Sequence, residues 1–68
     1  MQTIQPHQQR VIDEKAELDE KLSKLRPFIK ASPIFAKLPD DEKERMVRQE
    51  SCMTEYSGIL GERIKAFS

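Results

Sequence analysis

Apolar residues recur with the period of a helix, at steps of three, four or seven, along two long stretches of the chain. In the first stretch, about residues 7–30, the recurring apolar positions are Val11, Leu18, Leu22, Leu25 and Ile29. In the second, about residues 40–67, they are Met46, Met53, Leu60 and Phe67, each seven residues after the last. Residues spaced in this way share one face of an α-helix, so both stretches are predicted to be amphipathic helices. Residues 1–7 show no such period and are expected to form a tail.

The segment between these stretches carries two helix-start signals. Ser32 can cap a helix that has Pro33 at its first position, which predicts a short helical turn over about residues 33–37. A second start follows at about residue 40, where three acidic residues fill the first turn, as the helix dipole favours. The sequence therefore predicts an all-α fold, an antiparallel two-helix hairpin with a short helical turn at its corner.

Two local features leave alternatives open. Pro27 lies near the end of the first predicted helix, where it is expected either to kink the helix or to let it fray soon after Arg26. At the corner, Ile34, Phe35 and Leu38 either cap the open end of the hairpin core, or Phe35 projects and docks into a partner protein.

A second column of residues follows the apolar column of the second helix at a distance of three positions. It consists of Gln49, Tyr56 and Arg63, and it is expected to place a hydrogen-bonding ladder on the packing face. In one interpretation the column flanks the helix seam: Gln49 sets the register, and the other two side chains lie along the apolar surface and reach water. In the other it lines a pocket in which Arg63 binds an anion and Tyr56 stacks on a ring.

Gly58 and Gly61 lie inside the second predicted helix, where each destabilises the helix by ~1 kcal/mol relative to alanine. Three arrangements would offset this cost: a close helix–helix crossing, a bend, or room for a ligand. We therefore include both glycines in the candidate ligand-binding region.

Lys15 fills the one polar slot in the apolar stripe of the first helix. In an antiparallel hairpin it would lie near Leu60 or Arg63, and two cations at one seam would favour an anionic ligand. Two simpler alternatives are a surface lysine at the edge of the stripe, or a pairing of these cations with Glu14 and Glu62.

The length of 68 residues allows one domain, residues 1–68, which would bury only roughly 60% of its unfolded surface. Cys52 is the single cysteine, so no intrachain disulfide can stabilise the fold. A metal site is not expected either, because His7 is the only histidine. We therefore expect the hairpin to assemble with copies of itself into a homo-oligomeric helical bundle.

The charges balance, with 12 basic and 12 acidic residues, which argues against non-specific binding to nucleic acid. The acidic start of the second helix and the corner also disfavour a DNA-binding regulator. No apolar run approaches roughly 20 residues and no signal peptide is visible, so a membrane is not an expected partner. A single unpaired cysteine fits a reducing compartment, and a cytoplasmic location is expected.

Catalysis is not expected from this sequence. Nucleophilic catalysis requires a base beside a serine or cysteine, and the only histidine, His7, lies in the predicted tail. The many carboxylates lie on predicted exposed faces. We therefore predict a protein that is not an enzyme and needs no cofactor.

Three segments carry a resemblance to a known kind of protein: VIDEKAEL at 11–18, PIF at 33–35 and MTEYSGILGERI at 53–64. The chain resembles the small helical-hairpin accessory proteins that tailed phages and prophages encode. Its layout is similar to that of the anti-CBASS sponges, in which oligomerised hairpins hold cyclic nucleotides, with basic residues on the phosphates and aromatic residues on the bases. The resemblance implies Arg63 and Lys15 as phosphate contacts and Tyr56 as the base contact.

The expected function is that of a phage-type accessory binding protein that counters host defence. It would act as a homo-oligomer that sequesters a small cyclic nucleotide immune signal. The alternative is an inhibitor or adaptor that binds a host or phage protein without a small ligand.

Overall fold

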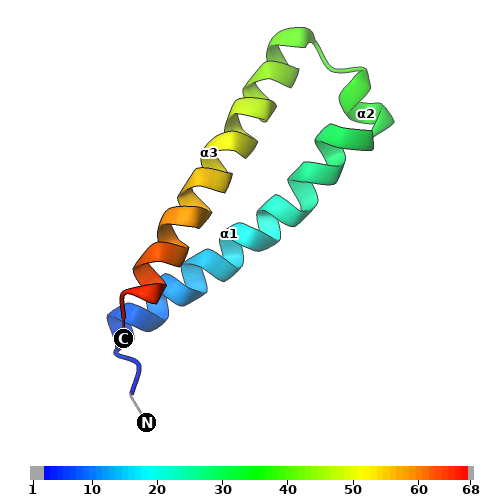
Figure 1. Ribbon diagram of the computed structural model, residues 1–68. Helices are drawn as coiled ribbons and strands as arrows, with labels where there is room; N and C mark the ends of the chain where they lie inside the picture. Colours follow the sequence, from blue (N-terminus) through cyan, green and yellow to red (C-terminus); the bar gives the residue numbers. More distant parts are fainter. Residues whose placement is uncertain (1–2, 68) are drawn as a thin grey trace.

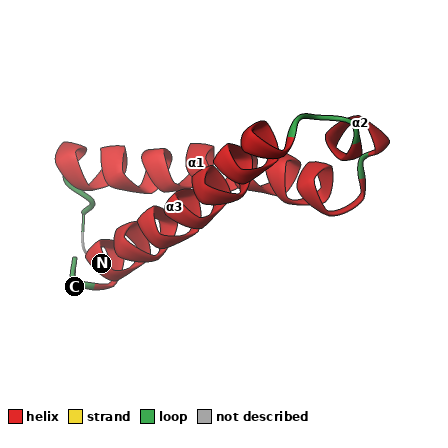
Figure 2. Cartoon of the chain, turned by 90° about the horizontal axis from the view of Figure 1, so that it is seen from above, coloured by secondary structure: helices red, strands yellow, loops and turns green. Residues whose placement is uncertain are grey.

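The computed structural model describes residues 3–67, which form three helices: α1 (Pro6–Ala31), α2 (Pro33–Ala36) and α3 (Asp40–Lys65). The long helices α1 and α3 run antiparallel, α2 connects them at one end, and the start of α1 meets the end of α3 at the other (Figure 1). Seen from above, α1 and α3 cross at an angle (Figure 2). The predicted all-α class is confirmed.

α1 begins at Pro6, inside the segment that was expected to be a tail. Proline suits this position, because its missing N–H would lack a partner in the first turn anyway. The backbone N–H of Gln5 donates a hydrogen bond to the side-chain oxygen of Gln8 at 2.9 Å, which satisfies one of the free donors at this helix end. The first two residues of the predicted tail lie outside the described part of the chain.

α1 continues through Pro27 to Ala31, so of the two alternatives for this proline, fraying soon after Arg26 is wrong. The residues that follow the proline are held by tertiary packing. The rings of Phe28 and Phe35 meet edge to face with their centroids 6.0 Å apart. The backbone N–H of Ser32 also donates to the carbonyl of Phe28 at 3.2 Å. These contacts offset the helical hydrogen bond that a proline removes.

The corner forms as the capping signal indicated, with one exception among its apolar residues. The side-chain oxygen of Ser32 accepts a hydrogen bond from the backbone N–H of Ile34 at 3.2 Å, and α2 ends one residue earlier than expected. Phe35 is half-buried against Phe28, and the Lys43 ammonium lies 6.0 Å from its ring centroid. Phe35 therefore covers the end of the hairpin, whereas Ile34 is 65% exposed.

The core lies between α1 and α3, in the half of the hairpin farther from α2. Its buried apolar side chains are Val11, Leu18, Leu22 and Leu60. Three partly buried residues, Met53, Ile64 and Phe67, pack against the cluster of Val11, Leu18 and Leu60. α3 ends at Lys65, two residues before the end that the apolar period suggested. The final apolar residue, Phe67, thus reaches the core from a turn.

The hairpin is a rod of 51 × 15 × 15 Å with a radius of gyration of 15.5 Å. A compact domain of this length would have a radius of about 11 Å. Its accessible surface is 5410 Å², against about 4,400 Å² for a compact monomer of the same mass. Two helices alone thus leave much of their surface unburied. No helix within residues 3–67 is both long and apolar enough to cross a membrane.

Candidate functional site

The polar column predicted on the packing face does not lie there. Gln49, Tyr56 and Arg63 are all exposed, and Tyr56 is 42% exposed. The polar residues that face α1 are instead Glu50 and Ser57, one position further along the chain. The residues three and four positions after Met46 or Met53 both neighbour the apolar column, but on different sides of it. The position of α1 decides which of them is covered.

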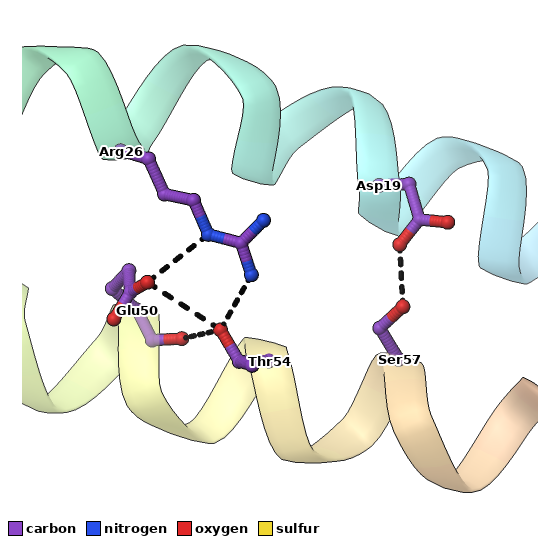
Figure 3. Close-up of polar contacts among 5 residues, drawn as sticks. All are labelled: Asp19, Arg26, Glu50, Thr54 and Ser57. Carbon is purple, nitrogen blue, oxygen red and sulfur yellow. Dashed lines mark hydrogen bonds and ion pairs between the residues drawn. The ribbon is translucent and has the colours of Figure 1, made fainter.

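A ladder of polar contacts crosses the seam between α1 and α3 (Figure 3). The Ser57 hydroxyl donates a hydrogen bond to the Asp19 carboxylate. Seven residues after Asp19 on α1, Arg26 contacts two residues of α3. Its Nε lies 3.1 Å from the Glu50 carboxylate, and its Nη2 donates to the Thr54 hydroxyl at 2.8 Å. We call these five residues the polar edge of the hairpin.

Both sets of contacts belong to one antiparallel register. Arg26 lies seven residues after Asp19 on α1, and Glu50 lies seven residues before Ser57 on α3. The Thr54 hydroxyl also donates to the backbone carbonyl of Glu50 at 2.9 Å, which orients it as the acceptor for Arg26. A shift of either helix by one turn would break each of the contacts that join α1 to α3.

Lys15 lies beside this ladder and is neutralised within it. Its ammonium lies 2.6 Å from the Asp19 carboxylate, and its Cε would be 3.4 Å from a Cβ added at Gly61. The hydrogen bond from Lys15, and then the one from Ser57, lower the pKa of Asp19 below its ordinary value. Lys15 therefore lies beside Gly61, the residue after its predicted neighbour Leu60. Its ion-pair partner is Asp19, four residues further along the same helix.

The structure separates Lys15 from Arg63. Arg63 is two residues after Gly61, which places it about 200° further round α3 on a helix of 3.6 residues per turn. Lys15 contacts the Gly61 side of the helix, so the two cations lie on opposite sides of α3. The expectation of two free cations at one seam is wrong for a single hairpin.

The two glycines have different surroundings. Gly61 leaves space for the Lys15 stem, which a side chain would contact. Gly58 is exposed, and a Cβ added there would meet nothing within 4 Å. The Lys15 stem is therefore the one neighbour that a side chain at position 61 would meet, and nothing within 4 Å accounts for Gly58.

Gln49, Tyr56 and Arg63 form a second candidate surface, which we call the Tyr56 face. These residues are spaced by seven, so they lie on one side of α3, with Tyr56 and Arg63 about 10 Å apart along its axis. Among the described residues, no carboxylate pairs with Arg63. The Gln49 amide donates a weak hydrogen bond to the Met53 sulfur at 3.7 Å. This face offers an accessible aromatic ring and a guanidinium without a carboxylate partner within residues 3–67.

Metal chemistry has no visible basis in the part of the chain that the structure describes. Residues 3–67 contain no cluster of three His, Cys, Asp or Glu side chains that could hold a metal ion. Cys52 is a free, exposed thiol on α3. The remaining candidates are therefore the polar edge and the Tyr56 face.

Comparison with known proteins assigns the chain to a family. The family model described as Sequestin matches residues 5–66, a span that includes all three helices, the polar edge and the Tyr56 face. Neither the curated proteins nor the solved structures contain a significant match. Because the match covers nearly the whole hairpin, the chain belongs to the Sequestin family.

Proposed function

We propose that this protein sequesters a small anionic nucleotide, in the manner of a phage-type accessory protein that counters host defence. The name of its family, Sequestin, itself suggests a sequestering binding function. A cyclic nucleotide immune signal is the ligand class that we put forward, since it combines phosphates with stacking bases.

The observation that carries this proposal is the Tyr56 face. Tyr56 is the only tyrosine of a chain with few aromatic residues, and its side chain is not used in the core: it is 42% exposed. Arg63 lies on the same side of α3 and lacks an ion-pair partner among residues 3–67. A guanidinium binds phosphate through its planar fork, and an aromatic ring stacks on a base. Gln49 adds an amide that can bond to polar atoms of the ligand.

The other predicted ligand residues do not join this face in one hairpin. Lys15 and Gly61 lie beside the polar edge, on the other side of α3. Gly58 is two residues from Tyr56 and therefore points away from it. Ligand sites in proteins bury about 70–90% of a ligand, which one helix face cannot do. We therefore propose that the protein binds its ligand as a homo-oligomer.

Isothermal titration calorimetry with a panel of cyclic and linear nucleotides tests the proposal. We expect the wild type to bind at least one cyclic nucleotide. Tyr56→Ala should weaken binding by about tenfold or more, because stacking of a base on an aromatic ring contributes ~1–3 kcal/mol. Arg63→Ala should weaken it similarly through the lost phosphate contact.

Arg48→Ala is the matched control, because Arg48 is also an exposed arginine of α3 but lies outside the Tyr56 face. This variant should bind as the wild type does. If the wild type binds no nucleotide of the panel, the sequestration of a nucleotide is refuted.

A second candidate function is inhibition of a host or phage protein without a small ligand. Ile34 supports it, because this apolar residue is 65% exposed on α2 at the tip of the hairpin. Native mass spectrometry separates the two functions. A co-purified mass of several hundred daltons supports the nucleotide ligand, whereas an assembly without added mass supports the inhibitor.

A further inference from the structure

The two edges of the hairpin differ in chemistry. The polar edge holds Asp19 and Arg26 of α1 against Glu50, Thr54 and Ser57 of α3. A step of one residue turns a helix by about 100°, which carries a side chain across the seam to the other edge. The residues one step before those of the polar edge and before Gly61 are Leu18, Leu25, Gln49, Met53, Tyr56 and Leu60. We call five of them, all except the amide Gln49, the apolar edge.

The polar edge is satisfied within one chain. Its charged and hydroxyl groups pair with one another, and no buried side-chain nitrogen or oxygen of the described residues lacks a partner. The apolar edge is only partly covered. Leu25 and Met53 are half-buried and Tyr56 is 42% exposed, although these side chains continue the same surface as the buried Leu18 and Leu60. The apolar edge therefore has apolar surface left to bury, whereas the groups of the polar edge are already paired with one another.

From this asymmetry we propose that a second copy of the chain covers the apolar edge. The area supports this occupant: the hairpin exposes 5410 Å², about 1,000 Å² more than a compact monomer of its mass. A standard stable interface buries about 800 Å² on each partner, so one copy packed on each hairpin accounts for the excess. The same edge on both copies would form a two-fold symmetric contact that ends at the dimer.

This inference deepens the proposed function, since it rests on the self-association proposed there but not on the ligand. Tyr56 belongs both to the apolar edge and to the Tyr56 face. A second copy on this edge would bring two Tyr56 rings and two Arg63 guanidinium groups to the border of one interface. A ligand held there would be buried by both copies.

Tyr56→Glu and Val47→Glu form a matched pair for the test. Tyr56 and Val47 are 42% and 47% exposed on α3. Val47 lies seven residues before Thr54, so it flanks the polar edge. Light scattering at micromolar concentration should give the wild type and Val47→Glu at least twice the chain mass of 7.9 kDa. Tyr56→Glu should give a single copy, because the charge would be buried in the interface.

Thermal unfolding followed by circular dichroism keeps the test decisive if Tyr56→Glu loses stability. Unfolding of a dimer depends on concentration, so the Tm of the wild type and Val47→Glu should rise with protein concentration. The Tm of Tyr56→Glu should be lower and independent of concentration.

Three outcomes would overturn the inference: a wild type of single mass with a concentration-independent Tm, a Tyr56→Glu variant that still associates, or a Val47→Glu variant that dissociates. A wild-type dimer that binds no nucleotide would refute the proposed ligand and leave this interface standing.

Discussion

Asp19 is the residue on which the polar edge depends, because it accepts from Lys15 on its own helix and from Ser57 on the opposite helix. Both donors favour the ionised carboxylate, which lowers its pKa. Exposed ion pairs contribute only about 0–1 kcal/mol each, and the Arg26 and Glu50 side chains are 50% and 30% exposed. The ladder therefore contributes more to the choice of register than to the free energy of unfolding.

The lowered pKa of Asp19 predicts a pH dependence with a definite sign. The folded state binds the Asp19 proton less readily than the unfolded chain, whose carboxyl has its ordinary pKa of 3.8. The stabilisation is thus complete above this ordinary pKa and is lost as the pH falls through the lower folded value. Asp19→Asn should have a lower Tm than the wild type at pH 7, and the difference should shrink below about pH 4.

The other carboxylates are common to both proteins, so their titration cancels in this difference. Thermal unfolding at matched concentration between neutral and acidic pH provides the measurement. A Tm difference that stays constant over the whole range would contradict the role assigned to Asp19.

At the scale of one element, α3 contains two glycines in different settings. Gly58→Ala should raise the free energy of unfolding by about 0.5–1 kcal/mol, because its Cβ meets no neighbour and alanine is the better helix former. Gly61→Ala should gain less, because its Cβ would contact the Lys15 stem that Asp19 holds in place.

Urea unfolding of both glycine variants checks this difference, and Lys15→Ala supplies the matched background. In that background the two substitutions should become equivalent, since the contact at Gly61 is gone. An equal gain for both variants in the wild-type background would show that the Lys15 contact has no energetic effect.

At the scale of the whole molecule, the polar edge limits which side of the rod can associate. Replacing Asp19 and Ser57 together with leucine should leave the hairpin helical, because apolar replacement of a partly buried polar pair is often neutral or stabilising. The double variant should also have a second apolar edge that can pack against another copy of the chain. We expect light scattering to show an assembly larger than that of the wild type.

Asp19→Asn is the control for this double variant, because it keeps a polar residue at the edge and should keep the wild-type mass. If the double leucine variant has the same mass as the wild type, the polar edge does not restrict association.

The helices of this protein could be predicted because an α-helix has its own period. Apolar residues at steps of three and four indicate α1 and α3 without any knowledge of what they contact, and Ser32 with Pro33 indicates α2. Pro27 shows the limit of such local rules. The packing of Phe28 on Phe35, which joins two helices, keeps α1 intact beyond the proline.

The sequence by itself thus determined the helical elements, and the tertiary structure alone decided which polar residues lie between them. Gln49 and Glu50 are equally good neighbours of the apolar column, and only the position of α1 covers Glu50 and leaves Gln49 exposed. Asp19 and Ser57 lie 38 residues apart, so no local period relates them. The physical reason is that a helical period specifies a face within one helix, whereas the side of that face that is buried depends on the neighbouring helix.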